Sequence, residues 1–240
     1  MTLYSRIVLI AVFAVTCLMF QPGCGKSDDE SPSSQVMLIH AEPELDNFSV
    51  VYNNDQLSQD LSYPAHSDYV SVPGGKEVLF SIQEPDTDSN LLVLRVKTLT
   101  AGKYYSMLMV PEPDFTIEAV IFADTIARAD TGKVTLRVIN ASPNSGEINA
   151  RIIGLATDTT LTNLEFNPAA PSEMSAFLPG LPEGGYEIFF TNSISGDEIY
   201  QINDLQFEAG GSYSIILSGY VPSGTVELPP LLAHIISHRP

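Results

Sequence analysis

The fold is decided by the stretch Val134-Thr135-Leu136-Arg137-Val138-Ile139-Asn140-Ala141-Ser142-Pro143. Val134, Leu136 and Val138 stand two residues apart and share one face of an extended chain, while Thr135 and Arg137 take the other. This alternation predicts a half-buried β-strand. The strand must end near Pro143, because proline cannot donate to a hydrogen-bond ladder.

A second copy of this stretch lies 100 positions earlier, where Ile39-His40-Ala41-Glu42-Pro43 matches Ile139-Asn140-Ala141-Ser142-Pro143. Two more landmarks follow each copy in the same order. The first pairs Pro73-Gly74-Gly75-Lys76-Glu77-Val78-Leu79-Phe80 with Pro182-Glu183-Gly184-Gly185-Tyr186-Glu187-Ile188-Phe189-Phe190, and the second pairs Ala101-Gly102-Lys103-Tyr104-Tyr105 with Ala209-Gly210-Gly211-Ser212-Tyr213. The chain is therefore predicted to be an internal duplication.

Short β-branched and aromatic runs, separated by turns rich in glycine and proline, fill the rest of the 240 residues. This pattern is typical of an all-β protein, and we predict two tandem immunoglobulin-like or transthyretin-like β-sandwich domains. The expected boundaries are 35–124 and 133–240, with a linker at 125–132. The expected strands are 36–41, 48–53, 68–72, 76–83, 91–99, 103–110 and 117–123, then 133–141, 148–153, 164–166, 174–178, 186–191, 198–207, 212–220 and a last one within 225–236.

The N-terminus has the features of a signal peptide. Arg6 precedes an apolar run at residues 7–20, which is short for a transmembrane helix. Gly23-Cys24 follows and resembles a bacterial lipoprotein cleavage box, which implies a signal peptide at 1–23 and lipidation of Cys24. Cys17 is a competing site with a shorter apolar run before it, and ordinary secretion or a retained anchor helix is the alternative. Residues 24–34 are polar and acidic and are predicted to form a flexible tether.

Charge and cysteine content exclude several classes of function. The net charge is −18, and such a field repels phosphate backbones, so we expect no nucleic-acid partner. The only cysteines are Cys17 and Cys24. The mature domains therefore hold no disulfide, no thiol nucleophile and no thiolate metal ligand.

No cofactor, metal or catalytic residue is predicted. The stretch Asp86-Thr87-Asp88-Ser89-Asn90 places oxygen atoms as a calcium loop does, but Leu91 and Lys97 stand where glycine and glutamate belong, so a hairpin turn is preferred. His234 and His238 have no third zinc ligand near them in the sequence. His40 and His66 are isolated and are interpreted as structural. Common catalytic motifs are absent, although the 29 acidic residues could include a glycosidase pair.

Two tyrosines are predicted to be structural. Tyr105 and Tyr213 each follow an Ala-Gly turn and begin a strand whose apolar residues share their face, as in the tyrosine corner of immunoglobulin-like sandwiches. A bond from each hydroxyl to nearby backbone is expected. Structural roles are likewise expected for Gly102 and Gly210 in the turns, and for Pro43 and Pro143 at the strand ends.

The second repeat resembles the bacterial domain of unknown function 4397. The resemblance rests on residues 137–143 and 148–154, on Leu181-Pro182-Glu183-Gly184-Gly185-Tyr186, and on Phe207-Glu208-Ala209-Gly210-Gly211-Ser212-Tyr213. In the first repeat Glu42 replaces the serine of the motif, and His40 keeps a histidine that is frequent in the family. The resemblance implies an exported β-sandwich, often on a lipoprotein, and it transfers no catalytic residue.

The sequence therefore predicts a non-catalytic lipoprotein of the cell envelope, in the outer membrane, that faces the surface or the periplasm. Its expected partners are the membrane, through the lipid anchor, and a glycan or an envelope protein. A glycan-acting hydrolase and an accessory subunit of an outer-membrane complex are the alternatives. A cleft with two carboxylates about 5–10 Å apart would favour the hydrolase, and an uncovered edge strand would favour assembly.

Overall fold

The structure is a computed structural model of the chain. It describes residues 32–53, 55–85, 87, 89–96, 98–111, 117–124, 130–222, 224 and 228–238. The predicted signal peptide, Cys17, Cys24 and most of the tether lie outside these residues. Asp86, Asp88 and Lys97 of the calcium-like loop and residues 125–129 of the linker lie outside them as well.

The described residues form sixteen strands and one short helix. The strands before the linker are β1 (Ser33–His40), β2 (Asn47–Tyr52), β3 (Asp55–Ser62), β4 (Val70–Pro73), β5 (Val78–Gln83), β6 (Asn90–Val96), β7 (Tyr104–Pro111) and β8 (Ile117–Asp124). Those after it are β9 (Lys133–Ala141), β10 (Ile148–Gly154), β11 (Thr157–Leu164), β12 (Ser175–Pro182), β13 (Gly184–Asn192), β14 (Glu198–Phe207), β15 (Ser212–Ser218) and β16 (Leu232–His238). The helix α2 (Pro171–Met174) leads into β12.

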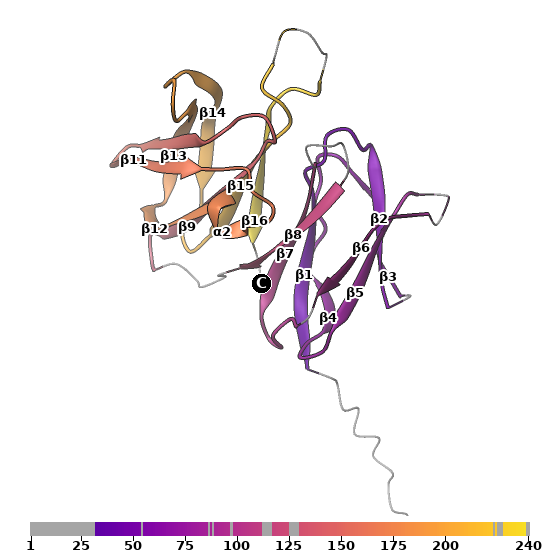
Figure 1. Ribbon diagram of the computed structural model, residues 1–240. Coiled ribbons are helices and arrows are strands. Elements are labelled where there is room, and N and C mark those ends of the chain that lie inside the picture. Colours follow the sequence, from indigo (N-terminus) through magenta and orange to yellow (C-terminus); the bar gives the residue numbers. More distant parts are fainter. Residues whose placement is uncertain are drawn as a thin grey trace, which may run out of the picture. The chain divides into compact units, whose positions relative to one another are not determined.

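The strands form two β-sandwiches with the same topology (Figure 1). In the first sandwich, sheet β4-β1-β7-β8 faces sheet β3-β2-β5-β6. In the second, sheet β12-β9-β15-β16 faces sheet β11-β10-β13-β14. Adding eight to each strand number of the first sandwich gives the second, and β1 runs parallel to β7 as β9 does to β15. The predicted all-β fold with two tandem sandwiches is thus confirmed.

The strand register makes the two repeats equivalent residue by residue. Met37 lies opposite Ser106 as Arg137 lies opposite Ser214. Tyr104 lies opposite Asp124 as Ser212 lies opposite His238. Three pairs of equivalent positions follow, namely 37 with 137, 106 with 214, and 124 with 238.

Three apolar layers hold the four sheets together. Each sandwich has its own core, around Phe48 and Phe80 in the first and Ile188 and Phe190 in the second. A third layer joins sheet β4-β1-β7-β8 to sheet β12-β9-β15-β16, which we call the inner sheets, and we call the region between them the joint. Its buried apolar residues are Met37, Ile39, Ala41, Leu108, Val110, Val120, Phe122, Ile139, Ala141, Met174, Ile216 and Ile236.

The joint corrects one expectation from the sequence. The strand that contains Arg137 was predicted to be half-buried, but β9 is buried on both faces from Leu136 to Ala141, and Arg137 is only 2% exposed. The prediction was wrong because alternation shows which residues share a face and does not show whether a second sheet covers the polar one. Strand β15, with alternating serines, is buried along its whole length for the same reason.

Two edge strands were missed. Strand β3 begins at Asp55, between the strands predicted at 48–53 and 68–72, and β11 ends at Leu164, where a strand was predicted to begin. Each is one of the two edge strands of its outer sheet, and most of its residues are polar. An edge strand that faces water needs few apolar residues, so the alternation that marks a strand in sequence is weak there.

No helix within the described part of the chain is long and apolar enough to cross a membrane. The division into domains at 35–124 and 133–240 stays a prediction, to be tested by folding of each piece alone.

Candidate functional site

A buried ion pair joins the two sandwiches. Nη1 of Arg137 on β9 lies 2.8 Å from Oδ1 of Asp124 at the end of β8, and both side chains are 2% exposed. The guanidinium also lies over the rings of Phe122 and Phe177, at 5.5 and 5.4 Å from their centroids. A charge buried this deeply is tolerated only where charged and hydrogen-bonding partners surround it.

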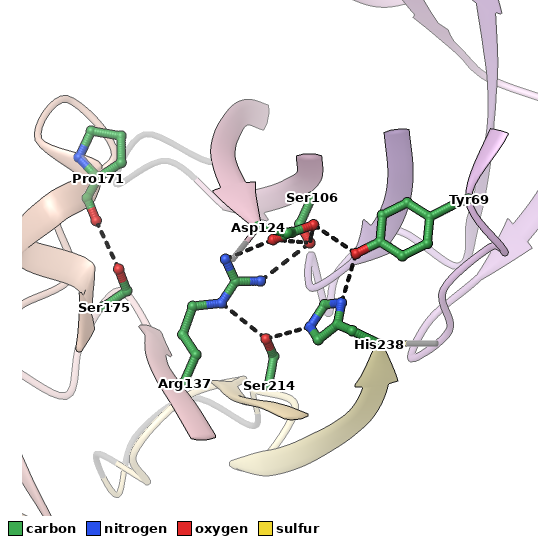
Figure 2. Close-up of polar contacts among 8 residues, drawn as sticks. All are labelled: Tyr69, Ser106, Asp124, Arg137, Pro171, Ser175, Ser214 and His238. Carbon is green, nitrogen blue, oxygen red and sulfur yellow. Dashed lines mark hydrogen bonds and ion pairs between the residues drawn. The ribbon is translucent and has the colours of Figure 1, made fainter. Parts of the chain in front are cut away.

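Two serines complete the surroundings of Arg137 (Figure 2). Nε donates to Ser214 Oγ at 2.9 Å, and Nη2 donates to Ser106 Oγ at 3.2 Å. Ser106 in turn donates to the carboxylate of Asp124, at 3.0 Å to Oδ1 and 2.8 Å to Oδ2. Because Ser106 belongs to the first sandwich and Ser214 to the second, the guanidinium binds both.

His238 and Tyr69 extend this network. His238 Nε2 lies 2.7 Å from Ser214 Oγ, and Nδ1 lies 2.7 Å from Tyr69 Oη. Tyr69 donates to Asp124 Oδ2 at 2.8 Å. Burial lowers the pKa of His238 to about 4; Asp124 opposes this shift, and Arg137 and His66 add to it. We call Tyr69, Ser106, Asp124, Arg137, Ser214 and His238 the joint network.

A second polar cluster lies at the opposite ends of the same strands. Tyr63 Oη lies 3.0 Å from Ser218 Oγ, which lies 3.1 Å from His234 Nε2. The Tyr63 ring meets the rings of His40 and His234 edge to face, both at 5.6 Å between centroids. Burial lowers the pKa of His40 and of His234 to about 4. All four histidines of the chain thus lie in the joint or at its rim, although His40 and His66 looked isolated in the sequence.

Glu42 is a buried carboxyl group. It is 4% exposed, and its Oε2 finds no hydrogen-bond partner within the described part of the chain. Burial raises the pKa of Glu42 to about 7, an effect that the backbone N–H of Glu44 partly offsets. The equivalent residue of the second repeat is Ser142, so the departure of the first repeat from the family motif places a titratable group here.

A cavity of about 380 Å³ opens beside the joint network. Met37 forms an apolar wall, and the rings of Tyr69 and Tyr104 meet edge to face with centroids 5.0 Å apart. Polar atoms come from both sandwiches, and the lining residues are Gln35, Met37, His66, Asp68, Tyr69, Tyr104 and Ser237. We call this space the joint cavity. Its size is at the lower end of the range of about 300–1,000 Å³ that is usual for small-ligand sites.

The joint cavity exists where the two repeats differ. Met37 holds the position that Arg137 holds in the second repeat, and Tyr104 holds the position of Ser212. Around Arg137 the guanidinium fills the space and is tied into the network. Around Met37 no such group is present, and the space is open to a ligand.

The residues predicted from sequence to be structural lie outside this cavity. Tyr105 Oη accepts a hydrogen bond from Thr100 N at 2.9 Å, and Tyr213 Oη accepts one from Glu208 N at 3.0 Å. Gly102 and Gly210 adopt left-handed backbone with φ of 72° and 75°, as their turns require. Pro43 and Pro143 begin the turns that follow β1 and β9. This geometry has the form that a structural role needs, and the role itself remains a prediction.

The described residues contain no cluster of three or more His, Cys, Asp or Glu side chains able to hold a metal ion. The calcium-like loop lies in part outside the described residues. His234 and His238 do lie on one strand, four residues apart, but each bonds to a serine of β15 instead of sharing a ligand.

The joint network was missed in the sequence because its members are far apart along the chain. One signal was available, since Arg137 is a charged residue in the interior of β9, between the apolar Leu136 and Val138. Its partner Asp124 was placed at the end of the first domain and was given no role. Nothing in the sequence indicates that Tyr69 reaches it.

Comparison with known proteins gives the family. Residues 34–151 match the family "Domain of unknown function (DUF4397)", so the chain carries a domain of this family. The matched stretch begins in β1 and ends in β10, and it therefore includes the linker between the sandwiches. A search of curated proteins gives no match.

Three solved structures show weak similarity. A family CBM26 carbohydrate-binding module from Eubacterium rectale, in complex with maltoheptaose, is 9% identical, with a TM-score of 0.27 over 87% of this chain and 98% of that one. A candidate adhesin from Bacteroides ovatus is 11% identical, with a TM-score of 0.26 over 89% and 96%. A streptococcal ancillary pilin is 12% identical, with a TM-score of 0.21 over 88% and 60%. TM-scores this low carry no argument about the function of this chain.

Proposed function

We propose that this protein is a non-catalytic binding module of the cell envelope that holds a neutral glycan in the joint cavity. The observation that carries the proposal is the composition of the cavity wall. Tyr69, Tyr104 and Met37 offer apolar surface for the C–H face of a sugar ring. Gln35, His66, Asp68 and Ser237 offer hydrogen-bonding groups for its hydroxyls.

Charge argues for a neutral ligand. The chain carries a net charge of −18, and Asp68 stands in the lining, so an anionic ligand would be repelled. Burial lowers the pKa of His66, which favours its neutral form near pH 7. A neutral polyol is repelled neither by the net charge of the chain nor by Asp68.

The cavity wall also favours binding over hydrolysis. Glycosidases place two carboxylates on either side of the bond they cleave. Of the described residues that line the joint cavity, Asp68 alone carries a carboxylate. The glycan-acting hydrolase is therefore the weaker alternative.

The proposal includes lipidation of Cys24 and location in the outer membrane, facing the surface or the periplasm. Its support is the sequence of the N-terminus, where an apolar run precedes Gly23-Cys24 and an acidic segment follows. A tether of this composition would hold the sandwiches away from the membrane while leaving the joint cavity open to ligand.

Strand β6 supports a second candidate, an accessory subunit that adds a strand from another envelope protein. Among the described strands β6 pairs only with β5, and its outward residues Leu91 and Val93 are 39% and 49% exposed. An apolar edge of this kind is open to pairing with an extended segment. Val93→Lys should abolish such an association and leave the joint cavity intact.

The test is glycan binding by residues 32–240, which keep the whole of β1, on an array of neutral and acidic oligosaccharides followed by calorimetry. Tyr104→Ser should weaken binding at least tenfold, and β15 already carries serine at the equivalent position 212. Asp46→Asn, a change at an exposed carboxylate outside the cavity, is the control. Binding that Tyr104→Ser leaves unchanged would place the ligand elsewhere, and retention of acidic glycans alone would contradict the charge argument.

A further inference from the structure

The joint network forms a closed ring of contacts through both sandwiches. From Arg137 the path runs to Ser214 at 2.9 Å, to His238 at 2.7 Å and to Tyr69 at 2.7 Å. It continues to Asp124 at 2.8 Å and returns to Arg137 at 2.8 Å. Figure 2 shows the five side chains around this circuit, with Ser106 bridging Arg137 and Asp124.

The directions of these bonds are fixed by the two ends of the ring. Arg137 only donates, and the carboxylate of Asp124 only accepts. Tyr69 uses its single proton toward Asp124, so His238 Nδ1 must donate to Tyr69 Oη. Nε2 of a neutral His238 must then accept, and the hydroxyl of Ser214 supplies the proton. The hydrogen bonds that run from Arg137 Nε through Ser214, His238 and Tyr69 to Asp124 can all form only when His238 is neutral and carries its proton on Nδ1.

A second proton on His238 has no favourable place. A proton on Nε2 would point at Ser214 Oγ, which already accepts a hydrogen bond from Arg137 Nε. The hydroxyl of Ser214 would then have lost Nε2 as the acceptor of its own proton. The charged and titratable groups near the imidazole are Arg137 on β9, Asp124 on β8, and Tyr69 and His66 before β4. Among these groups only Asp124 would stabilise a positive charge on His238, and its carboxylate is already paired with Arg137 at 2.8 Å. His238 itself is 5% exposed, so water would not solvate the charge.

Tyr69 couples this ring to the joint cavity. Its hydroxyl bridges His238 and Asp124, while its ring lines the cavity and packs against Tyr104. Ser237, the residue before His238, lines the cavity as well. Any movement of His238 away from Tyr69 therefore alters the cavity wall.

We propose that His238 acts as a proton-sensitive latch, in which proton uptake breaks the ring, releases Tyr69 and opens the joint cavity. The burial that lowers the pKa of His238 to about 4 places this event in acid. The part that concerns ligand release rests on the proposed function, whereas the latch itself does not. If a glycan occupies the cavity, its apparent affinity should fall about fourfold half a pH unit below the midpoint, because only the state with the intact ring of contacts binds it.

The first test is the tautomer of His238, read from the ¹⁵N and ¹³C shifts of the mature protein at pH 7. A neutral histidine in water favours the proton on Nε2, whereas the ring of hydrogen bonds around Arg137 requires it on Nδ1. Tyr69→Phe should remove this preference. An Nε2–H tautomer of His238 in the wild-type protein would overturn the proposal.

The second test follows the ring signals of Tyr69 and Tyr104 and the methyl signal of Met37 from pH 7 to pH 3.5. They should shift together with His238, with a midpoint near pH 4, and should stay fixed over this range in His238→Gln. His66→Gln, at the other histidine beside the cavity, is the control and should keep the transition. Signals that titrate equally in His238→Gln would show that another group is responsible.

The third test separates the latch from the ligand. The glycan with the highest affinity on the array is titrated by calorimetry into the wild-type protein, His238→Gln and Asp46→Asn between pH 7 and pH 3.5. The latch predicts that the fall in affinity is lost in His238→Gln and kept in Asp46→Asn, whose carboxylate is exposed and lies outside the cavity. Tyrosine signals that titrate in a protein that binds no glycan would support the latch and contradict the proposed function. A glycan affinity that does not change with pH while His238 titrates would contradict the coupling between His238 and the cavity.

Discussion

Ser106 and Ser214 occupy the same position in the two repeats, and both accept a hydrogen bond from the guanidinium of Arg137. Each then donates onward, Ser106 to Asp124 and Ser214 toward His238. Asp124 and His238 are themselves equivalent positions. The duplication therefore placed polar side chains at equivalent positions of both repeats. Arg137, which stands where the first repeat has Met37, joins the two sets.

Removing the guanidinium should destabilise the protein strongly. Arg137→Met leaves Asp124 buried without its ion-pair partner, and breaking a buried pair in this way costs about 3–5 kcal/mol. Adding Asp124→Asn should recover part of the loss, because the uncompensated charge is gone. The free energy of unfolding from urea titration of residues 32–240 checks both variants.

The control for this prediction is a surface pair of similar geometry. Arg151 and Asp158 lie 2.6 Å apart, but their side chains are 53% and 57% exposed. Water screens such pairs, so Arg151→Met should leave stability nearly unchanged. Equal losses in Arg137→Met and Arg151→Met would mean that burial of the joint pair contributes nothing.

Glu42 should make stability depend on pH in the opposite sense to the histidines. Its pKa is raised from 4.5 to about 7 in the folded state, so the folded protein holds this proton more tightly than the unfolded chain. The stability that this proton gives is complete below about pH 4.5 and is lost as pH rises through 7. The loss is on the order of 3 kcal/mol.

Glu42→Gln should therefore be more stable than the unmodified protein at pH 8 and nearly equal to it at pH 5. Denaturant unfolding at both pH values measures the difference, and Glu165→Gln, at an exposed carboxylate, serves as the matched control. A Glu42→Gln protein that gains nothing at pH 8 would show that the carboxylate reaches water in solution.

Much of the fold could be read from the sequence because alternation marks strands that have one dry face. Strands β9 and β14 were predicted at their observed bounds, 133–141 and 198–207. Strands β3 and β11 were not, because most of their residues are polar and leave little apolar alternation. Burial of Arg137 was also out of reach, since period-two alternation cannot show that another sheet covers the polar face.

The candidate site was hidden for a different reason. Tyr69, Asp124, Arg137 and His238 are brought together by packing of one sandwich on the other, which no local pattern encodes. The tyrosine corners, in contrast, are local, because Tyr213 bonds to a backbone N–H only five residues away. Contacts within one turn can be predicted from spacing, and contacts across the joint cannot.

Tyr213→Phe tests the structural role predicted for the corner. The variant removes the acceptor of the Glu208 N–H, so we expect a loss of roughly 1 kcal/mol, and up to about 3 if the amide is left unpaired. Gly211→Ala should also destabilise, because its Cβ would collide with the Tyr213 ring. Unaltered stability of Tyr213→Phe, together with lost glycan binding, would assign the tyrosine to a recognition site.

Lipidation at Cys24 is tested in cells. Cys24→Ala should abolish incorporation of labelled acyl chain and release the protein from the membrane fraction, because the tether and sandwiches supply no other anchor in the proposal. Cys17→Ala is the matched control and should leave both measurements unchanged. Membrane association with retained label in Cys24→Ala would move the modification to Cys17 or replace it with an uncleaved anchor.

The last prediction concerns folding of the two repeats apart from each other. Residues 34–124 and 131–240 each contain a complete sandwich core, so each piece should unfold cooperatively on its own. Separation also exposes the joint faces of the inner sheets, including Ile39, Leu108 and Ile216, which are fully buried in the intact chain. Each piece should therefore unfold at a lower temperature than the whole, and mixing the two should raise both transitions. If neither piece shows a cooperative transition in calorimetry, even when mixed with the other, the sandwiches form one folding unit and the boundary at 125–132 is not a domain boundary.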